Sequence, residues 1–435
     1  MSPKIVVLDD DPTGSQTVHS CLLLTRWDVA TLKMALADAA PLFFVLTNTR
    51  GMDAENAAAV TREVCRNLRL ALADYAHPVL FVSRSDSTLR GHYPVEIDVM
   101  ASELGPFDAT LLTPAFFEGG RITRDNTHYL MTDGQPVPTH QTEFARDSVF
   151  GYSTSYLPDY IAEKTGGRVP AHRVACLSLD DLRAGKADAW LADLRDQAVG
   201  VVNGETPDDY ARFADAVLQA AANGKRLLFR SAASLLTALA KLPPQPVAAE
   251  TFAQLVRGHR PGAVVVGSHV AKTTAQLAEL LKLRGTVGLP LDVARLPEGR
   301  ADCAAELIAS IAHAHARGLT PVVYTSRSER PFASPAERLA FGVAVSATLM
   351  EVVRSLPPTL GFLVSKGGIT SNDVLSCGLA LTAARVLGQI LPGVTVVQTP
   401  ADHRLPQMPV VIFPGNVGDN DALAEAVRRL AAGSR

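Results

Sequence analysis

The chain has 435 residues, which at roughly 150 residues per domain predicts two or three domains. Hydrophobic residues make up 47% of it, enough for large cores, and the net charge of −3 gives no reason to expect nucleic acid or an anionic membrane as a partner. No apolar run reaches the roughly 18 residues that span a bilayer, and the N-terminal residues lack a signal-peptide pattern. The five cysteines are scattered without a CxxC pair, which is typical of reduced thiols and predicts a cytoplasmic protein.

Short apolar runs alternate with longer amphipathic stretches over the first 240 residues. The runs predict strands at 5–8, 42–46, 79–82, 110–112, 174–177, 199–202 and 227–229. The amphipathic stretches predict helices at 30–39, 54–73, 95–103, 187–195, 208–221 and 232–239. Strands followed by crossover helices indicate a mostly parallel sheet with helices on both faces.

Two stretches interrupt this alternation. Residues 116–156 are polar, with weak periodicity, and are too long for an ordinary loop, which predicts a functional excursion over the sheet. Residues 242–246 carry three prolines in four positions, which cannot continue a helix and are typical of a linker.

A second αβ series follows residue 261. Strands are predicted at 263–266, 287–291, 321–324, 362–364, 394–397 and 410–413, and helices at 273–283, 303–314, 335–355 and 421–430. The predicted fold is therefore two α/β domains with mostly parallel sheets and a cleft between them, over residues 1–245 and 255–435. Ligands of open α/β sheets bind at the carboxyl ends of the strands, so functional residues are expected there.

The first strand runs directly into three carboxylates, Asp9, Asp10 and Asp11. Adjacent acids repel one another and are costly to bury without partners. They indicate either a solvated acidic turn or a general base or Mg²⁺ ligand beside a hydroxyl-bearing substrate. Thr13 and Gly14 fit a tight turn whose side-chain oxygen and backbone N–H reach a ligand.

Two further polar clusters follow predicted strands in this half. Residues 83–91 read SRSDSTLRG, in which arginine forks suit a carboxylate and the Ser, Thr and Asp side chains suit the hydroxyls of a polyol. The alternative is a helix-capping turn with surface arginines. Residues 114–123 form the third cluster. Together the three clusters predict a site for a small, anionic, hydroxylated molecule.

The second half offers glycine turns at strand ends instead. Residues 361–375 read GFLVSKGGITSNDVL, which predicts a strand, a glycine turn and a helix with Thr370 as N-cap. Such turns bind phosphate through free backbone N–H groups, and Lys366 adds a mobile positive charge. A plain βα turn is the alternative. Gly267-Ser268 and residues 413–419 are similar turns, and neither the P-loop nor the dinucleotide fingerprint is present.

Taken in order, these motifs resemble the four-carbon acid sugar kinase family over nearly the whole chain. The family's motifs match Asp10-Asp11-Pro12-Thr13-Gly14, Asp86-Ser87-Thr88-Leu89-Arg90-Gly91, residues 114–121, Gly267-Ser268, Lys366-Gly367-Gly368-Ile369-Thr370 and Pro414-Gly415-Asn416-Val417-Gly418. The resemblance implies an N-terminal domain that binds a sugar acid and a C-terminal domain that binds a nucleotide. It also implies phosphorylation by ATP and Mg²⁺ of the terminal hydroxyl of threonate, erythronate or an oxo-tetronate.

The resemblance also implies roles for individual residues. Either Asp10 or Asp11 is the general base, and Asp11 is favoured because it directly precedes the Pro12-Thr13-Gly14 turn. The sugar acid is expected at Thr13, Gly14, Arg84, Asp86, Ser87, Thr88, Arg90, Gly91 and Arg121, with Arg90 and Arg84 on its carboxylate. The nucleotide is expected at Ser268, Lys366, Gly367, Gly368, Ile369, Thr370, Gly415, Asn416, Val417 and Gly418. No residue is assigned to the metal, and a homo-oligomer is left open.

The chain departs from the family pattern at two positions. Arg84 stands where many relatives carry lysine, and Asp9 adds a third acid, so both bear on which sugar acid fits. Two other functions stay open at this point. One is a cytoplasmic sugar-acid sensor without turnover, which steady ADP release would exclude. The other is a lyase or isomerase of a phosphorylated sugar acid, which would need no ATP.

Overall fold

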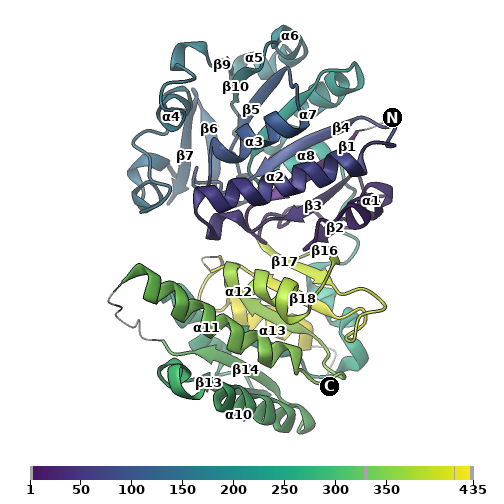
Figure 1. The fold of residues 1–435 in the computed structure, drawn as a ribbon, viewed down its shortest axis with the longest axis vertical. Coiled ribbons are helices and arrows are strands. Elements are labelled where there is room, and N and C mark those ends of the chain that lie inside the picture. Colours follow the sequence, from purple (N-terminus) through teal and green to yellow (C-terminus); the bar gives the residue numbers. More distant parts are fainter. Residues whose placement is uncertain (1–2, 328–331, 333, 416, 432–435) are drawn as a thin grey trace. The chain divides into compact units, whose positions relative to one another are not determined.

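The computed structural model describes residues 3–327, 332, 334–415 and 417–431. The chain divides into two compact units, Met1–Pro243 and Pro244–Arg435. Each unit is an α/β layer structure, so the α/β fold class and the mostly parallel sheets expected from the sequence are confirmed (Figure 1).

The sheet of the first unit is entirely parallel within the described residues, in the order β2-β3-β1-β4-β11-β5-β10-β9. Its central strand β1 (Lys4–Asp9) is buried along its whole length, as expected for a parallel strand covered on both faces. The other strands are β2 (Leu22–Leu24), β3 (Leu42–Leu46), β4 (Val79–Arg84), β5 (Ala109–Thr113), β9 (Ala175–Leu177), β10 (Ala198–Val202) and β11 (Leu227–Ser231). The prediction missed β2, whose apolar run is only three residues long.

Helices of the first unit pack in two groups. In one, α2 (Ala54–Ala71) contacts α1 (Val29–Ala37) and α3 (Val95–Leu104), and in the other α7 (Pro207–Ala222) contacts α5 (Leu179–Arg183), α6 (Ala187–Asp193) and α8 (Ala233–Ala240). Local sequence sets where they begin: Asp53 caps α2, and Thr206 at the N-cap forms a capping box with Asp209 in the first turn of α7. The short helix α4 (Leu157–Lys164) was not predicted.

The polar excursion at 116–156 contains an ordered antiparallel sheet that the periodicity did not reveal. Strands β6 (Arg121–Arg124), β7 (Thr127–Thr132) and β8 (Gln135–Pro138) are joined by tight turns. The turn residues Asp125, Asn126, Asp133 and Gly134 have positive φ, which short polar residues and glycine tolerate. Most residues of β7 and β8 are part-exposed or exposed, with no regular alternation of buried and exposed positions along these strands.

The second unit has a mixed sheet in the order β13-β14-β12-β15-β18-β17-β16. Strands β13 (Thr286–Leu291), β14 (Thr320–Thr325), β12 (Ala263–Val266), β15 (Leu363–Lys366) and β18 (Pro409–Phe413) are parallel, and β17 (Val394–Gln398) and β16 (Ala383–Leu391) add antiparallel. Strand β16 was missed because a register shift at Gly388 and polar residues interrupt its apolar run.

Helices of the second unit also pack in pairs. Helix α9 (Ala271–Leu280) contacts α13 (Ala422–Ala431), and α10 (Leu296–Ala316) contacts α11 (Pro335–Arg354). A short helix, α12 (Gly368–Asp373), continues into a π-helical turn at Val374–Gly378. A core of strand and helix side chains, including Val264, Phe362 and Phe413, fills the space between these layers.

Strand order creates one switch point in each unit. In the first, the chain leaves β1 toward β2 on one side, and leaves β4 toward β5 on the other. In the second, it leaves β12 toward β13 on one side, and leaves β15 toward β16 on the other. Neighbouring strands whose connections diverge open a crevice at their carboxyl ends, which is where α/β proteins bind ligands. The polar clusters at 9–14 and 83–91 and the glycine turns at 267–268 and 367–368 follow these four strands, whereas the cluster at 114–123 follows β5 and the turn at 413–419 begins at the end of β18.

Candidate active site

Asp9 is the last residue of β1, and its register places it beside Arg84 at the end of β4. Its side chain is fully buried, with Oδ1 3.1 Å from Nη1 of Arg84 and Oδ2 without a hydrogen-bond partner in the described chain. Burial raises the pKa of Asp9 to about 7, against the opposing charge of Arg84. A Cβ on Gly14 would lie 2.1 Å from Oδ2 of Asp9, so the following turn must carry glycine there.

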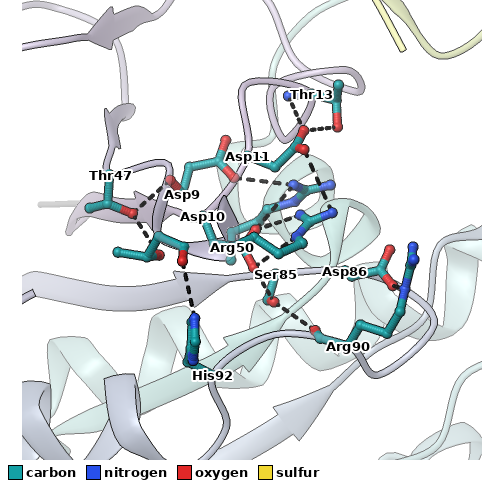
Figure 2. A network of polar contacts seen from close by, with 12 residues as sticks. Asp9, Asp10, Asp11, Thr13, Thr47, Arg50, Ser85, Asp86, Arg90 and His92 are labelled. Atoms are coloured by element: carbon teal, nitrogen blue, oxygen red, sulfur yellow. Dashed lines mark hydrogen bonds and ion pairs between the residues drawn. The ribbon is translucent and has the colours of Figure 1, made fainter. Parts of the chain in front are cut away.

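Asp10 is held on both carboxylate oxygens. Arg50 donates from Nη2 to Oδ1 at 2.6 Å and from Nε to Oδ2 at 3.2 Å, and Ser85 also donates to Oδ2 (Figure 2). The Asp10 side chain is only 2% exposed. Burial raises its pKa, but Arg50, Arg84 and Arg230 outweigh this effect and hold it below the ordinary value. Asp10 is therefore a buried, ionised carboxylate with its hydrogen-bonding capacity largely taken.

Asp11 is more accessible than its neighbour. Its Oδ1 accepts hydrogen bonds from the backbone N–H of Thr13, at 2.8 Å, and from the Thr13 hydroxyl. Its Oδ2 lies 3.6 Å from Nη1 of Arg50, and the side chain is 20% exposed. The Asp11–Thr13 turn thus fixes one oxygen, and the other faces Arg50.

Arg50 was not identified from the sequence, although it links the two acids. It follows β3 in a short 3₁₀ turn (Thr49–Gly51) that begins after Asn48 in a left-handed conformation. Its guanidinium lies between Asp10 and Asp11 in Figure 2. The signal that could have found it is the polar run that follows the strand end at Leu46, the same pattern used for the other clusters.

The turn after β4 places another ionised acid nearby. Arg90 donates from Nε to Oδ2 of Asp86 at 2.8 Å, and the Thr88 hydroxyl donates to the same oxygen. Burial raises the pKa of Asp86, but the charges of Arg50 and Arg90 outweigh it and hold the pKa well below the ordinary value. Figure 2 shows Asp86 and Arg90 facing each other beside the acidic turn.

The remaining residues of this turn are buried or tightly packed. The Ser87 carbonyl contacts Nε2 of His128 at 2.8 Å, and burial lowers the pKa of that histidine to about 4. Gly91 has φ of +115°, and a Cβ there would lie 2.4 Å from the Ser85 hydroxyl and 2.7 Å from Nη2 of Arg230. The glycine is therefore needed for both its conformation and this close packing.

Arg121 is the first residue of β6 and pairs with Phe116 across the turn that joins them. Its Nη1 donates to the carbonyl of Gly119, and its buried Nε has no hydrogen-bond partner in the described chain. Burial lowers the pKa of Arg121, while Asp86 raises it and Arg90 lowers it, so all three charges act on one another.

A second arginine missed by the sequence, Arg230, lies at the end of β11. Its Nη1 donates to Oε2 of Glu96 at 2.6 Å and to the Ser83 hydroxyl at 2.8 Å. It lines a small cavity of about 10 Å³, together with Ser85, Asp86, Leu89, Arg90, Leu112, Pro114, Tyr160 and Ser231. The buried Ser231 hydroxyl has no partner in the described chain. A charged residue ending an apolar strand run was the available signal.

In the second unit, register brings the predicted glycine turns together. Val266 pairs with Lys366, and Lys366 pairs with Phe413, so β12, β15 and β18 end side by side. The Gly367 N–H donates to the Phe413 carbonyl at 2.9 Å. The turns that follow these strands therefore leave the sheet at the same edge.

The structure corrects the expected start of the helix after β15. The N-cap of α12 is Gly367, with φ of +114°, and Thr370 lies inside the helix rather than at its N-cap. The Thr370 hydroxyl instead packs against Gly267, where a Cβ would lie 2.1 Å from it. Only glycine at 367 combines this positive φ with the close approach of Ser268, so the turn reaches its conformation three residues earlier than predicted.

Lys366 is not the mobile surface charge that the sequence suggested. It is fully buried, and its Nζ donates to the carbonyls of Pro414 and Gly415 and lies 4.2 Å from the ring centroid of Phe413. Burial lowers its pKa to about 7, with a further lowering by Lys272. The side chain thus ties the turn after β15 to the turn after β18.

A cavity of about 420 Å³ opens at this edge of the second unit. Of the predicted nucleotide residues, it is lined by Ser268, Gly367, Gly368, Ile369, Thr370 and Gly415. Its apolar wall includes Val293, Phe341, Val345, Leu349 and Met350, largely from α11. Val417 and Gly418 lie behind it, where Gln276 and Lys272 bond to their carbonyls. Asn416 lies outside the described residues. The volume lies in the range of small-molecule sites.

Comparison with family models agrees with this layout. A model described as a sugar-binding N-terminal domain matches residues 5–239, more than half of the chain, and one described as a nucleotide-binding C-terminal domain matches residues 263–423. The chain belongs to the four-carbon acid sugar kinase family.

Two curated proteins of this kinase family are similar to the chain. D-erythronate kinase of Heliobacterium modesticaldum is 31% identical over 37% of this chain, and D-threonate kinase of Bordetella bronchiseptica is 30% identical over 36% of it. The matches span 36% and 38% of those two proteins, little more than a third of either.

Two solved structures have a similar fold over nearly the whole length of this chain. A Haemophilus influenzae protein has a TM-score of 0.65 and 17% identity, covering 98% of this chain and 100% of its own. A Salmonella typhimurium LT2 protein has a TM-score of 0.69 and 17% identity, covering 98% and 99%. In the part of this chain that the structure describes, no helix is both long and apolar enough to cross a membrane.

Proposed function

We propose that this protein is an ATP-dependent kinase that phosphorylates the terminal hydroxyl of a four-carbon sugar acid such as erythronate, threonate or an oxo-tetronate. The observation that carries the proposal is the cavity of about 420 Å³ lined by three adjacent strand-end turns, two of them rich in glycine, in the unit matched by a nucleotide-binding family model. The kinase names of the two curated relatives support the same reaction.

The nucleotide phosphates would lie against the turns at Ser268, Gly367 and Gly415. Exposed backbone N–H groups and the turn geometry favour anions at such strand ends. The base would contact the apolar wall contributed by α11. Lys366 would support the phosphate site indirectly, because its hydrogen bonds to the Pro414 and Gly415 carbonyls fix the position of the turn after β18.

Asp373 is the carboxylate among the described residues that line this cavity, and Ser346 donates to its Oδ2. Together with Ser268 and Thr370 it offers the oxygen donors that Mg²⁺ prefers, usually one or two carboxylates alongside phosphate oxygens. These residues would hold Mg²⁺, which when bound neutralises charge on the phosphates during transfer.

The sugar acid would bind in the first unit, at the ends of β1 and β4. Asp11 would accept the proton of the attacking hydroxyl, because its side chain is 20% exposed whereas that of Asp10 is 2% exposed. Asp10, saturated by Arg50 and Ser85, would hold Arg50 in place. Asp86, Ser87 and Thr88 would contribute to binding the hydroxyls. Phosphoryl transfer depends mainly on positioning and on charge neutralisation, so a bound acid, ATP and Mg²⁺ are the components that the proposal needs.

Product analysis tests this function. The full chain is incubated with ATP, Mg²⁺ and D-erythronate or D-threonate, and the product is examined by ³¹P and ¹H NMR. We expect a phosphate ester whose phosphorus couples to the protons of C4. An ester at C2 or C3 would contradict the assignment of the terminal hydroxyl. Consumption of a phosphorylated sugar acid without ATP would contradict the kinase proposal and favour a lyase or isomerase.

A further inference from the structure

The arginines of the first-unit site differ in whether a carboxylate of the chain pairs with them. Four of them are ion-paired within the chain: Arg50 with Asp10 at 2.6 Å, Arg84 with Asp9 at 3.1 Å, Arg90 with Asp86 at 2.8 Å and Arg230 with Glu96 at 2.6 Å. Arg121 has no carboxylate within 4.0 Å among the residues that the structure describes. It is thus the site cation whose charge the chain does not itself neutralise by direct contact.

This arrangement is costly without a ligand. The Nε of Arg121 is buried and unpartnered, and Nη1 has only the Gly119 carbonyl as an acceptor. Removing a cation from water without a compensating anion is unfavourable, and the lowered pKa of Arg121 has this origin. An arriving carboxylate would supply the missing charge and could accept two parallel hydrogen bonds from the guanidinium fork.

The surroundings of Arg121 suit a hydroxy acid. The turn at 116–121 holds the side chain, since Nη1 donates to the Gly119 carbonyl, and a Cβ on Gly119 would lie 2.6 Å from that nitrogen and 2.4 Å from the Phe116 ring. Asp86 and Arg90 are close enough to act on its charge. A carboxylate at Arg121 would therefore lie within range of the charges of Asp86 and Arg90, whose side chains can accept and donate hydrogen bonds to hydroxyls.

We propose that Arg121 binds the carboxylate of the sugar acid, and that Arg90 instead holds Asp86 in position for the hydroxyls. This refines the function proposed above and rests on it. It also reassigns the role that the sequence gave to Arg84 and Arg90, both of which already have carboxylate partners.

The test compares the acid with its uncharged counterpart. Calorimetry on the full-length chain measures binding of D-erythronate, D-threonate and their amides to wild type, Arg121→Gln, Arg121→Lys and Arg90→Gln. Arg124→Gln is the matched control, because Arg124 lies on the same strand but pairs with Glu205 at the surface. ADP formation is measured in parallel.

We expect Arg121→Gln to weaken binding of the acid by about 30-fold to several thousand-fold, the usual loss for one partner of a buried charge pair. Affinity for the amide should change little, so the preference for the acid disappears. Arg121→Lys should restore part of that preference, and Arg124→Gln should keep all of it. Arg90→Gln should weaken acid and amide alike.

Other outcomes overturn the inference. If Arg121→Gln keeps the wild-type preference for the acid, the arginine only braces its turn. If Arg90→Gln loses that preference, Arg90 is the carboxylate ligand. If wild type binds neither tetronate, the anion is not a four-carbon acid. Failure of the kinase proposal has a different signature: tetronate binds in an Arg121-dependent manner, but no ADP is formed, and the inference then stands.

Discussion

Replacing each of two adjacent acids by asparagine should separate chemistry from structure. The side chains of Asp10 and Asp11 are 2% and 20% exposed, and Arg50 contacts both. Asparagine keeps the shape and one acceptor oxygen but removes the basicity. We expect Asp11→Asn to lower kcat by about 10² to 10⁴, the usual contribution of a general base, with little change in KM for the sugar acid.

For stability we expect the opposite ranking: Asp10→Asn should destabilise the protein more than Asp11→Asn does. Asp10→Asn breaks a buried pair in which Arg50 contacts both oxygens, at 2.6 and 3.2 Å. Loss of one partner of such a pair costs about 3–5 kcal/mol. For a unit of this size each kcal/mol lowers Tm by about 2–4 °C, so the expected drop is roughly 6–20 °C. Asp11→Asn alters a partly exposed contact and should leave Tm nearly unchanged.

Both quantities are measured on the same preparations, by steady-state ADP release at saturating ATP and Mg²⁺ and by scanning calorimetry. An Asp11→Asn variant with normal turnover, beside an inactive Asp10→Asn variant of wild-type Tm, would refute the reasoning and exchange the two roles. Normal turnover in both variants would make the acidic turn structural and move the search for the base to Asp86.

Three further changes have directional outcomes. Gly367→Ala puts a Cβ 3.1 Å from the Cβ of Ser268, on a residue with φ of +114°, which strains the backbone by roughly 1–3 kcal/mol. Calorimetry should therefore show weaker ADP binding and unchanged D-threonate binding, whereas equal losses of both would indicate unfolding. The pKa of Lys366 is near 7 in the folded chain and 10.5 when the side chain is free, so between these pH values the unfolded chain binds more protons. The free energy of unfolding should therefore rise with pH across that window, and Lys366→Met should flatten the rise. The pKa of Asp9, raised from 3.8 to about 7, means the reverse, so urea unfolding should show stability falling from about pH 4 to 7, a trend that Asp9→Asn removes.

The sheets were predictable because parallel strands buried on both faces read as apolar runs. Strand β3 was predicted with its observed bounds, and β1 and β4 within two residues. Short or interrupted strands escaped: β2 has three residues, and Gly388 breaks the run of β16. The antiparallel sheet at 121–138 escaped because its strands are part-exposed and four residues long in two cases.

The grouping of candidate site residues was predictable where several polar residues follow one strand, as at 9–14 and 83–91, since the carboxyl ends of parallel strands share one edge. Pairing was not predictable. Arg50 and Arg230 are single residues whose importance arises only when β3 and β11 are placed beside β1 and β4. Lys366 was misread because a lysine beside glycines gives no local sign that its Nζ turns inward to the Pro414 carbonyl.

The central claim is that a tetronate is phosphorylated at the expense of ATP, and ADP stoichiometry tests it most directly. The full chain with ATP and Mg²⁺ is given D-erythronate, D-threonate and 3-oxo-tetronate in turn, and ADP is followed to completion by a coupled assay. We expect at least one of these acids to yield one ADP for each molecule consumed, with no ADP above background in its absence. The account would be contradicted if the rate of ADP release were the same with and without each of the three acids, or if the acids bound and no ADP formed.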